Sequence, residues 1–329
     1  MIPLIKPKHL QAGDTVGIVA PAGAPFEEGQ LEFAFHWLDK LGLKYKLGKH
    51  IYDRHGGLAG TDADRSRDLN EMWADKQVKA IFPARGGNGA VRLLPRLDFE
   101  MIRDNPKIII GYSDITGLLI PIHQKTGLVT FHGPTANSFF DSDYTYRHFQ
   151  RALFEPQPLG AIEDPALPSD GYAPKYPPPR MVITPGTAAG QLTGGCLTLV
   201  KNLMGSPFEI ETEGKILFLE EVREEPCAVD RMLCQLLLAR KLQKAAGILF
   251  GESIDCKPGE SQRKVSKLSA SLESVLRHRL AGLQIPVVYG LRFGHGACKL
   301  TLPLGVMARL EAHACHQVRL SIDEAATSE

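Results

Sequence analysis

The sequence predicts an α/β protein of two domains, the first built on a doubly wound parallel sheet and the second a mixed α/β unit. Three observations lead to this fold class. The chain has 329 residues, which exceeds the size of a typical single domain. Its first half alternates short apolar runs with segments of helical periodicity, as parallel sheets covered on both faces do. A proline-rich stretch, residues 156–190, then precedes a second series of strands and helices.

The expected strands of the first half are short runs of mostly apolar residues. They lie at residues 15–20, 43–46, 80–83, 107–111 and 129–131. Between them, apolar residues at helical spacing predict helices over 30–41, 62–75 and 114–125. Thr61 is placed to cap the second of these helices. Strands that are apolar throughout imply a sheet buried on both faces.

Residues 156–190 contain nine of the 23 prolines and are therefore expected to form neither regular helix nor central strand. We interpret them as a linker between an N-terminal domain, residues 1–155, and a C-terminal domain, residues 191–329. The second domain has its own strand and helix patterns. Helices are predicted at 197–204, 228–242 and 267–280, and strands at 215–219, 247–250 and 287–289. Its end, residues 299–302, 306–310 and 318–322, is predicted to form antiparallel pairs.

Composition excludes several function classes. With 38 basic and 37 acidic residues, the net charge of +1 gives no reason to expect a nucleic-acid partner. The N-terminal stretch lacks the apolar core of a secretory signal, so a cytoplasmic location is expected. No run of about 18 apolar residues occurs, so no membrane partner is expected. The six cysteines lack CxxC spacing and are expected to be reduced. His313, Cys315 and His316 are the one group of potential metal ligands that lie close together in the sequence. They fall in a strand-like segment, so no metal site is expected, and no cofactor is expected either.

Ser113 follows the apolar run 108–110 and precedes a predicted helix. A serine on a sharp strand-to-helix turn is exposed at the carboxyl end of a sheet, where the amide of the next residue, Asp114, can stabilise an oxyanion. The sequence from Gly111 to Ile115, GYSDI, resembles the Gly-x-Ser-x-Gly elbow of hydrolases without its second glycine. Taken alone, capping of the helix by Ser113 or Asp114 is the simpler interpretation. From these residues alone, Ser113 could be either a nucleophile or a helix cap.

A glycine-rich loop, Arg85-Gly86-Gly87-Asn88-Gly89, follows the predicted strand at residues 80–83. Neighbouring parallel strands end on the same side of a sheet, so this loop is expected beside Ser113. Its glycines allow backbone amides to approach a ligand closely, which suits a second oxyanion donor or an anion cradle. It is not a phosphate-binding Walker loop, because no Lys-Ser/Thr follows. A simple tight turn is the alternative.

Two further residues could complete a hydrolytic site. Glu220 closes a predicted strand and is followed by Glu221, so either could orient a base or begin a solvated loop. His295 stands between two glycines in a loop, and histidine is the side chain best suited to proton transfer near neutral pH. His132 is a rival that we interpret as structural or substrate-facing. The order Ser…Glu…His is one known arrangement of a hydrolase triad, although spacing alone does not select these residues.

Six segments in order resemble the LD-carboxypeptidase family, whose best known members are muramoyl-tetrapeptide carboxypeptidases. They are VAPAG (19–23), ARGGNGAVRLL (84–94), IGYSDIT (110–116), FLEE (218–221), RML (231–233), and FGH (293–295) with TLPLG (301–305). The resemblance runs from about residue 13 to residue 310. It implies a flavodoxin-like N-terminal domain, a mixed C-terminal domain, and an active site between them.

The resemblance also implies roles for single residues. Ser113 corresponds to the family's nucleophile, Glu220 to its triad acid and His295 to its base, with Glu221 left as the alternative acid. The oxyanion amides would come from Asp114 and Gly87. Substrate binding is assigned to the rest of the glycine loop, namely Arg85, Gly86 and Asn88.

The implied reaction is removal of the terminal D-alanine from a murein tetrapeptide during peptidoglycan recycling, by a homodimer. Within the family, an immunity-type peptidase that cleaves peptide-nucleotide antibiotics of the microcin C type is the alternative. The absence of an aromatic residue from segment 254–266, where one could stack on adenine, favours the murein substrate. From a different class, a non-enzymatic binding protein would also suit two α/β lobes around a cleft.

Overall fold

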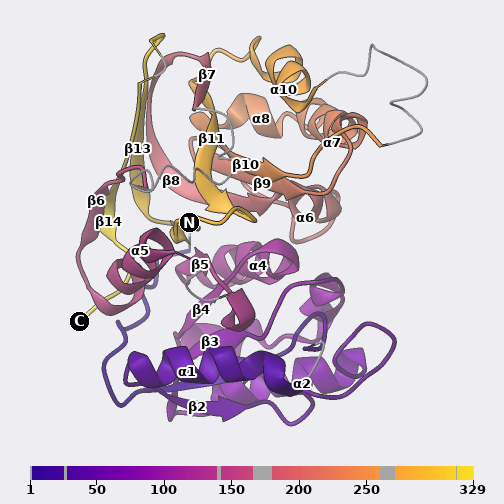
Figure 1. Ribbon diagram of the computed structural model, residues 1–329, viewed down its shortest axis with the longest axis vertical. Coiled ribbons are helices and arrows are strands. Elements are labelled where there is room, and N and C mark those ends of the chain that lie inside the picture. Colours follow the sequence, from indigo (N-terminus) through magenta and orange to yellow (C-terminus); the bar gives the residue numbers. More distant parts are fainter. Residues whose placement is uncertain (1, 26–27, 139–141, 166–179, 260–270, 316) are drawn as a thin grey trace, which may run out of the picture.

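The computed structural model describes residues 2–25, 28–138, 142–165, 180–259, 271–315 and 317–329. Its strands form two sheets, one of six strands and one of eight, within these ranges. Figure 1 shows the two sheets as separate units along the long axis of the molecule, with α4 and β5 of the first unit facing β8 and α6 of the second.

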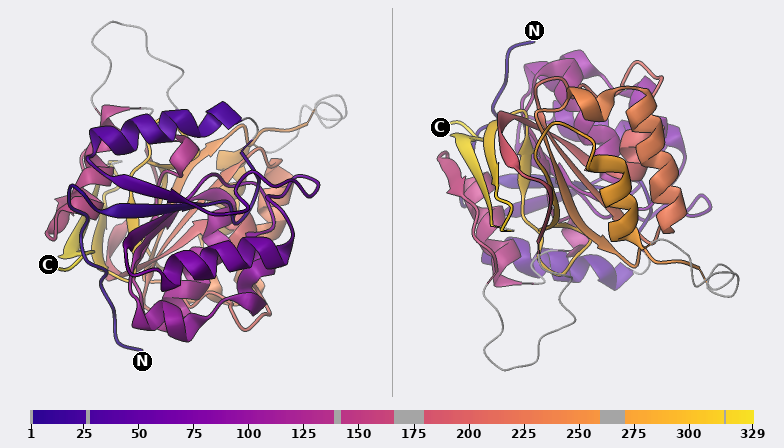
Figure 2. Two further views of the ribbon diagram at one scale, coloured as in Figure 1. Left: turned by 90° about the horizontal axis from the view of Figure 1, so that it is seen from below. Right: turned by 90° about the horizontal axis from the view of Figure 1, so that it is seen from above.

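The first sheet has the strand order β12-β5-β4-β3-β1-β2. Five of these strands run parallel: β1 (Thr15–Val19), β2 (Lys44–Leu47), β3 (Val78–Pro83), β4 (Ile108–Gly111) and β5 (Thr130–His132). Helices lie on both faces, as Figure 2 shows: α1 (Glu32–Lys40), α2 (Asp62–Ala74), α3 (Phe99–Asp104), α4 (Thr116–Thr126) and α5 (Asp143–Phe154). This order and coverage confirm the predicted doubly wound, flavodoxin-like fold.

Local signals explain these elements. All four residues of β4 are buried, as expected for a strand covered by helices on both faces. The side chain of Thr61 accepts from the backbone N–H of Asp64, and Asp64 returns a bond to the N–H of Thr61, so a capping box begins α2 where the sequence predicts it. Trp73 on the inner face of α2 is fully buried and donates its indole N–H to the carbonyl of Asn105.

The second sheet has the order β6-β14-β13-β8-β9-β10-β11-β7. Its central strands run parallel: β8 (Gly186–Cys196), β9 (Ile216–Val222), β10 (Gly247–Ile254) and β11 (Val287–Gly294). Antiparallel strands flank them: β6 (Pro158–Ala161), β7 (Met181–Thr184), β13 (Met307–Ala312) and β14 (Val318–Ala325). The helices are α6 (Leu197–Asn202), α7 (Pro226–Leu238), α8 (Lys241–Lys244) and α10 (Leu272–Leu280). The second unit is therefore mixed α/β, as predicted.

The proline-rich segment differs from expectation. It contains β6 and β7, which are the two edges of the eight-stranded sheet, and the first residues of the central strand β8. Edge strands tolerate proline because one side of their backbone has no ladder partner, which explains how Pro158 begins β6. Residues 166–179, which hold most of the remaining prolines, lie outside the described residues. The domain boundaries at 155 and 190 stay predictions.

Two other predicted elements need correction. The helix predicted over 228–242 ends at Leu238, because Arg240 adopts a left-handed backbone with φ of 59° between α7 and α8. At the C-terminal end, β13 and β14 pair as predicted. However, β12 (Leu302–Leu304) instead pairs antiparallel with β5, so the C-terminal part of the chain supplies an edge strand to the first sheet.

Candidate active site

Ser113 lies immediately beyond β4, at the start of a short 3-10 turn, η3 (Ser113–Ile115), that leads into α4. Its φ of 60° lies in the left-handed region, which is strained for a residue other than glycine and is found preferentially at functional sites. The turn is tight: a Cβ atom on Gly111 would stand 2.7 Å from Cγ2 of Ile115. Ile115 therefore occupies the place of the elbow's second glycine by packing back onto the first.

The glycine-rich loop lies beside Ser113, as expected. A Cβ atom on Gly86 would stand 3.0 Å from the Cβ and 3.1 Å from the Oγ of Ser113, and 3.6 Å from the backbone nitrogen of Asp114. Gly87 has a φ of 129°, and a Cβ on it would meet the backbone nitrogen of Gly23 at 3.2 Å. Gly86 thus approaches the serine closely, while Gly87 faces the turn after β1. Asn88 is exposed.

Two buried side chains hold these loops together. Arg65, on α2, donates to the carbonyl of Pro21 and, at 3.1 Å, to the carbonyl of Gly89. The carboxylate of Asp114 accepts the backbone N–H of Ala90 at 2.8 Å. Burial raises the pKa of Asp114, and the bond from Ala90 opposes that rise. The side chain of Asp114 therefore fixes the glycine loop, a role the sequence did not indicate.

Glu220 and His295 meet at the carboxyl ends of β9 and β11, two strands of the second sheet that are separated by β10. Glu220 lies near the end of β9 and is fully buried, and His295 directly follows β11. The Nδ1 of His295 lies 2.7 Å from the Oε2 of Glu220, in the geometry of an imidazole N–H donating to a carboxylate. Glu221 points elsewhere: its carboxylate accepts the backbone N–H and hydroxyl of Thr198 at 2.9 and 2.7 Å. Strand alternation thus separates the two glutamates.

The two sheets bring Ser113 and His295 to the same region. The ring of Tyr112, next to Ser113, lies 4.8 Å from the ring of His295, edge to face. Close by, the backbone N–H of Cys196 at the end of β8 donates to Thr116 at the start of α4, at 3.1 Å. Among the described residues no hydrogen bond joins Ser113 to His295, a contact that active sites often complete only with substrate bound.

Comparisons with known proteins identify the family of this chain. Residues 16–133 match the family model of the LD-carboxypeptidase N-terminal domain, and residues 189–310 match that of the C-terminal domain. The chain belongs to the LD-carboxypeptidase family. It is 41% identical to the probable murein peptide carboxypeptidase of Bacillus subtilis, over 93% of this chain and 91% of that one.

Two further relatives bear on the substrate. The murein tetrapeptide carboxypeptidase of Pseudomonas aeruginosa is 30% identical over 91% of this chain and 93% of its own. The microcin C7 self-immunity protein MccF of Escherichia coli is 32% identical over 92% of both. The solved structure of MccF in an inactive mutant apo state superposes with a TM-score of 0.84, at 29% identity, over 98% of this chain and 99% of that chain.

Arg85 is the first residue of the glycine loop. It is half-buried, and its guanidinium donates to the carbonyl of Ala24 at 3.3 Å. A Cβ atom on Gly23 would stand 3.4 Å from the Cζ of Arg85, so the side chain lies over the turn after β1. Burial lowers the pKa of Arg85, with a smaller opposing influence from Tyr112. The charge is therefore positioned close to the residue that precedes Ser113.

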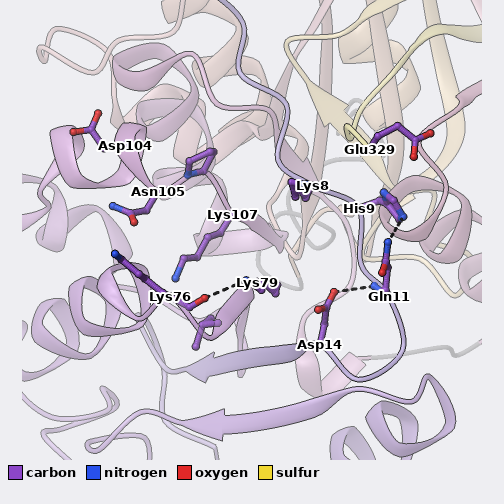
Figure 3. A pocket seen from close by; sticks show the side chains of 12 residues that line it. Lys8, His9, Gln11, Asp14, Lys76, Lys79, Asp104, Asn105, Lys107 and Glu329 are labelled. Atoms are coloured by element: carbon purple, nitrogen blue, oxygen red, sulfur yellow. Dashed lines mark hydrogen bonds between the residues drawn. The ribbon is translucent and has the colours of Figure 1, made fainter.

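A cavity of about 430 Å³ lies away from these residues (Figure 3). It is lined by Asp14, Val78 and Lys107, which precede or begin β1, β3 and β4, together with Lys8, Lys76 and Lys79. These are the amino ends of the parallel strands, whereas ligands of such sheets bind at the carboxyl ends. The cavity is therefore separate from Ser113, which lies at the opposite end of β4.

No helix within the described ranges is long and apolar enough to cross a membrane. The described residues also contain no group of three or more His, Cys, Asp or Glu side chains placed to hold a metal ion. Of the group His313, Cys315 and His316, the first two fall in the turn between β13 and β14, and His316 lies outside the described residues.

Proposed function

We propose that this LD-carboxypeptidase is a serine peptidase that removes the terminal D-alanine from murein tetrapeptides, in peptidoglycan recycling in the cytoplasm. The observation that carries the proposal is the hydrogen-bonded pair of Glu220 and His295. The strained Ser113 supports it as well, because its neighbour Tyr112 contacts the ring of His295. The relatives named as murein peptide carboxypeptidases support the substrate class.

In the proposed mechanism, His295 takes the proton of Ser113 while Glu220 holds the imidazole by its Nδ1–H. The Oγ of Ser113 attacks the carbonyl carbon before the terminal D-alanine. The resulting oxyanion accepts the backbone N–H of Asp114 and a second amide from the glycine loop, with Gly87 as the predicted donor. His295 then protonates the leaving amine. Water hydrolyses the acyl-enzyme by the same proton transfers in reverse order.

Arg85, Gly86 and Asn88 are proposed to bind the substrate. The terminal D-alanine carries a free carboxylate, which requires a cation or several N–H donors. Arg85 interacts electrostatically with Tyr112, the residue before Ser113, and Gly86 approaches Ser113 without a side chain of its own. Asn88, exposed at the tip of the loop, would contact the peptide further out.

The deciding experiment is mass spectrometry of purified murein tri-, tetra- and pentapeptides after incubation with the enzyme. We expect loss of one alanine from the tetrapeptide. Ser113→Ala should abolish this loss while leaving the fold intact, and Ser321→Ala, a serine on β14 of the other sheet, serves as the matched control. Turnover retained by Ser113→Ala would refute the nucleophile. The homodimer stays a prediction that light scattering would test.

Similarity to MccF supports a second candidate, hydrolysis of a peptide-nucleotide antibiotic. Residues 254–266 contain no aromatic side chain for stacking on a nucleobase, although residues 260–266 lie outside the described structure. Comparing cleavage of the tetrapeptide with that of an aminoacyl sulfamoyl adenylate separates the two substrates. Labelling of Ser113 by a fluorophosphonate would argue against a protein that only binds its ligand.

A further inference from the structure

His132 lies where the elements that carry the three proposed catalytic side chains meet. It is the last residue of β5, in register with Gly111 of the parallel strand β4 and with Leu302 of the antiparallel strand β12. Its neighbours are therefore the strand that leads to Ser113 and the strand supplied by the C-terminal part of the chain. His132 is 1% exposed, so it does not face a substrate directly.

The ring of His132 contacts three aromatic rings edge to face. The centroid distances are 5.4 Å to Phe218, 6.2 Å to Phe293 and 6.4 Å to Tyr112. Each of these residues comes one or two positions before a member of the proposed triad. Phe218 and Glu220 lie two apart on β9, which places their side chains on the same face of that strand. The imidazole is thus packed directly among the residues that position the site.

The chemistry of His132 is unusual for a core residue. Burial lowers its pKa to about 4, so the ring is neutral at pH 7 and carries one N–H donor. Among the described residues, neither ring nitrogen has a hydrogen-bond partner. The Oε1 of Glu220 is equally buried and equally without a donor, since His295 contacts only Oε2. Buried polar atoms are nearly always paired in native proteins. The structure forms no hydrogen bond between His132 and Glu220, but the cluster holds an unused donor and an unused acceptor, and one bond between them would satisfy both.

Electrostatic coupling supports this pairing. The negative charge of Glu220 raises the pKa of His132, and the imidazole of His295 lowers it, both to a smaller extent than burial does. The three groups therefore lie within interaction range of one another. A neutral donor also suits the role better than a cation, because a second positive charge would compete with His295 for the carboxylate.

We propose that His132 is a positioning residue that acts through Glu220: its ring N–H supports the Oε1 of the carboxylate and so fixes the plane in which Oε2 orients His295. The inference rests on the proposed function, because it assigns Glu220 and His295 to the same dyad. It goes beyond that function by adding a buried fourth residue, supplied by the first sheet, to a dyad that stands on the second.

The test uses variants that separate the donor from the shape of the ring. His132→Phe keeps the aromatic contacts and removes the N–H, and His132→Gln restores a donor on a flexible chain. His148 is a matched control: it is also buried, its pKa is also lowered to about 4 by burial, and it lies on α5 away from the dyad. His148→Phe therefore makes the same chemical change elsewhere in the first domain.

The first readout is the downfield proton resonance of the N–H that joins His295 to Glu220, which needs no substrate. We expect His132→Phe to shift it upfield or to expose it to solvent exchange, and His132→Gln and His148→Phe to retain it. The second readout is hydrolysis of the tetrapeptide. We expect His132→Phe to lower kcat by about 10- to 100-fold, less than loss of the base itself, with little change in KM. His132→Gln should recover most of this loss.

Thermal unfolding establishes that each variant is folded, and His132→Met, which also lacks a donor, replaces His132→Phe if the latter does not fold. A folded variant without a donor that keeps both the resonance and kcat would overturn the proposal. Failure of a folded His132→Gln to recover either would also overturn it, because the role would then be one of shape. If the tetrapeptide is not a substrate, all kinetic measurements are blank while the resonance still decides the role of His132.

Discussion

The α-carbon of Gly294 lies against the carboxylate of Glu220: a Cβ atom on this glycine would stand 2.6 Å from Oε2. The φ of Gly294 is +92°, which a residue with a side chain rarely adopts. On the other side of His295, Gly296 lies against a second buried carboxylate, that of Glu252. The two glycines that flank the histidine therefore let its loop rest directly on two glutamates. Close packing therefore explains why glycines flank His295, without any need for a flexible loop.

Gly294→Ala is expected to move His295 away from Glu220. The added methyl group collides with the carboxylate, and the alanine must keep a backbone conformation that is strained for a residue with a side chain. We therefore expect a loss of about 1–3 kcal/mol in the free energy of unfolding. Because His295 is the proposed base, its displacement from Glu220 should lower kcat by at least about 100-fold. Gly282→Ala is the control, since a Cβ there meets nothing within 4 Å. Urea denaturation and tetrapeptide hydrolysis measure both effects, and full activity in Gly294→Ala would contradict the close approach.

Glu220→Gln and Glu221→Gln should have opposite consequences. Glu220 contacts His295, so its amide variant disturbs the tautomer of the proposed base and should lower kcat by about 10³- to 10⁴-fold with little loss of stability. Glu221 accepts bonds from Thr198 and from the N–H of Val222, so its variant should lower the free energy of unfolding by about 1–3 kcal/mol and keep most activity. Parallel kinetics and denaturation on the two proteins measure this, and the reverse pattern would assign the acid to Glu221.

Local patterns in the sequence were sufficient for most of the fold. The strands and helices around Ser113 follow from apolar runs, helical spacing and caps such as Thr61, all of which act within a few residues. The choice between Glu220 and Glu221 could not be made in this way. Alternation along β9 says only that the two side chains face opposite ways, and which face meets His295 depends on β11, some 70 positions later.

Long-range backbone contacts were likewise invisible in the sequence. Arg65 stands in a helix rich in charged residues and looks solvent-exposed, yet its side chain is buried and binds carbonyls 44 and 24 positions away. The three residues of β12 carry a strand signal that does not specify a partner, and they pair with β5 instead of with their neighbours in sequence. Both contacts connect segments that only tertiary packing brings together.

The stability of the protein should rise with pH through Lys107. Burial lowers the pKa of Lys107 from 10.5 to about 8, and its ammonium donates to the carbonyls of Met72 and Asp75 at the cavity of Figure 3. Between pH 8 and 10.5 the unfolded chain therefore binds a proton that the folded chain does not, and folding gains stability as pH rises. Below pH 8 both states are protonated and the full penalty of burying the charge remains.

Relative to Lys107→Met, the wild type is expected to gain about 1–3 kcal/mol in the free energy of unfolding between pH 7.5 and 10. Urea denaturation at several pH values measures this difference. Lys76→Met, at an exposed position on the same cavity, controls for the loss of one lysine. A difference between wild type and Lys107→Met that stays constant with pH would show that the amine is solvated.

The backbone of Ser113 gives a test of the elbow that does not depend on catalysis. Its φ of 60° is strained for any side chain, so Ser113→Gly should be more stable than Ser113→Ala by about 1 kcal/mol, although both lack the nucleophile and should be inactive. At Ser274, an exposed residue in α10, the order should reverse by a similar amount, because alanine favours the helix and glycine does not. Urea denaturation of the four variants measures the two differences. If alanine is as stable as glycine at position 113, the serine is not held in the left-handed conformation that the structure gives it.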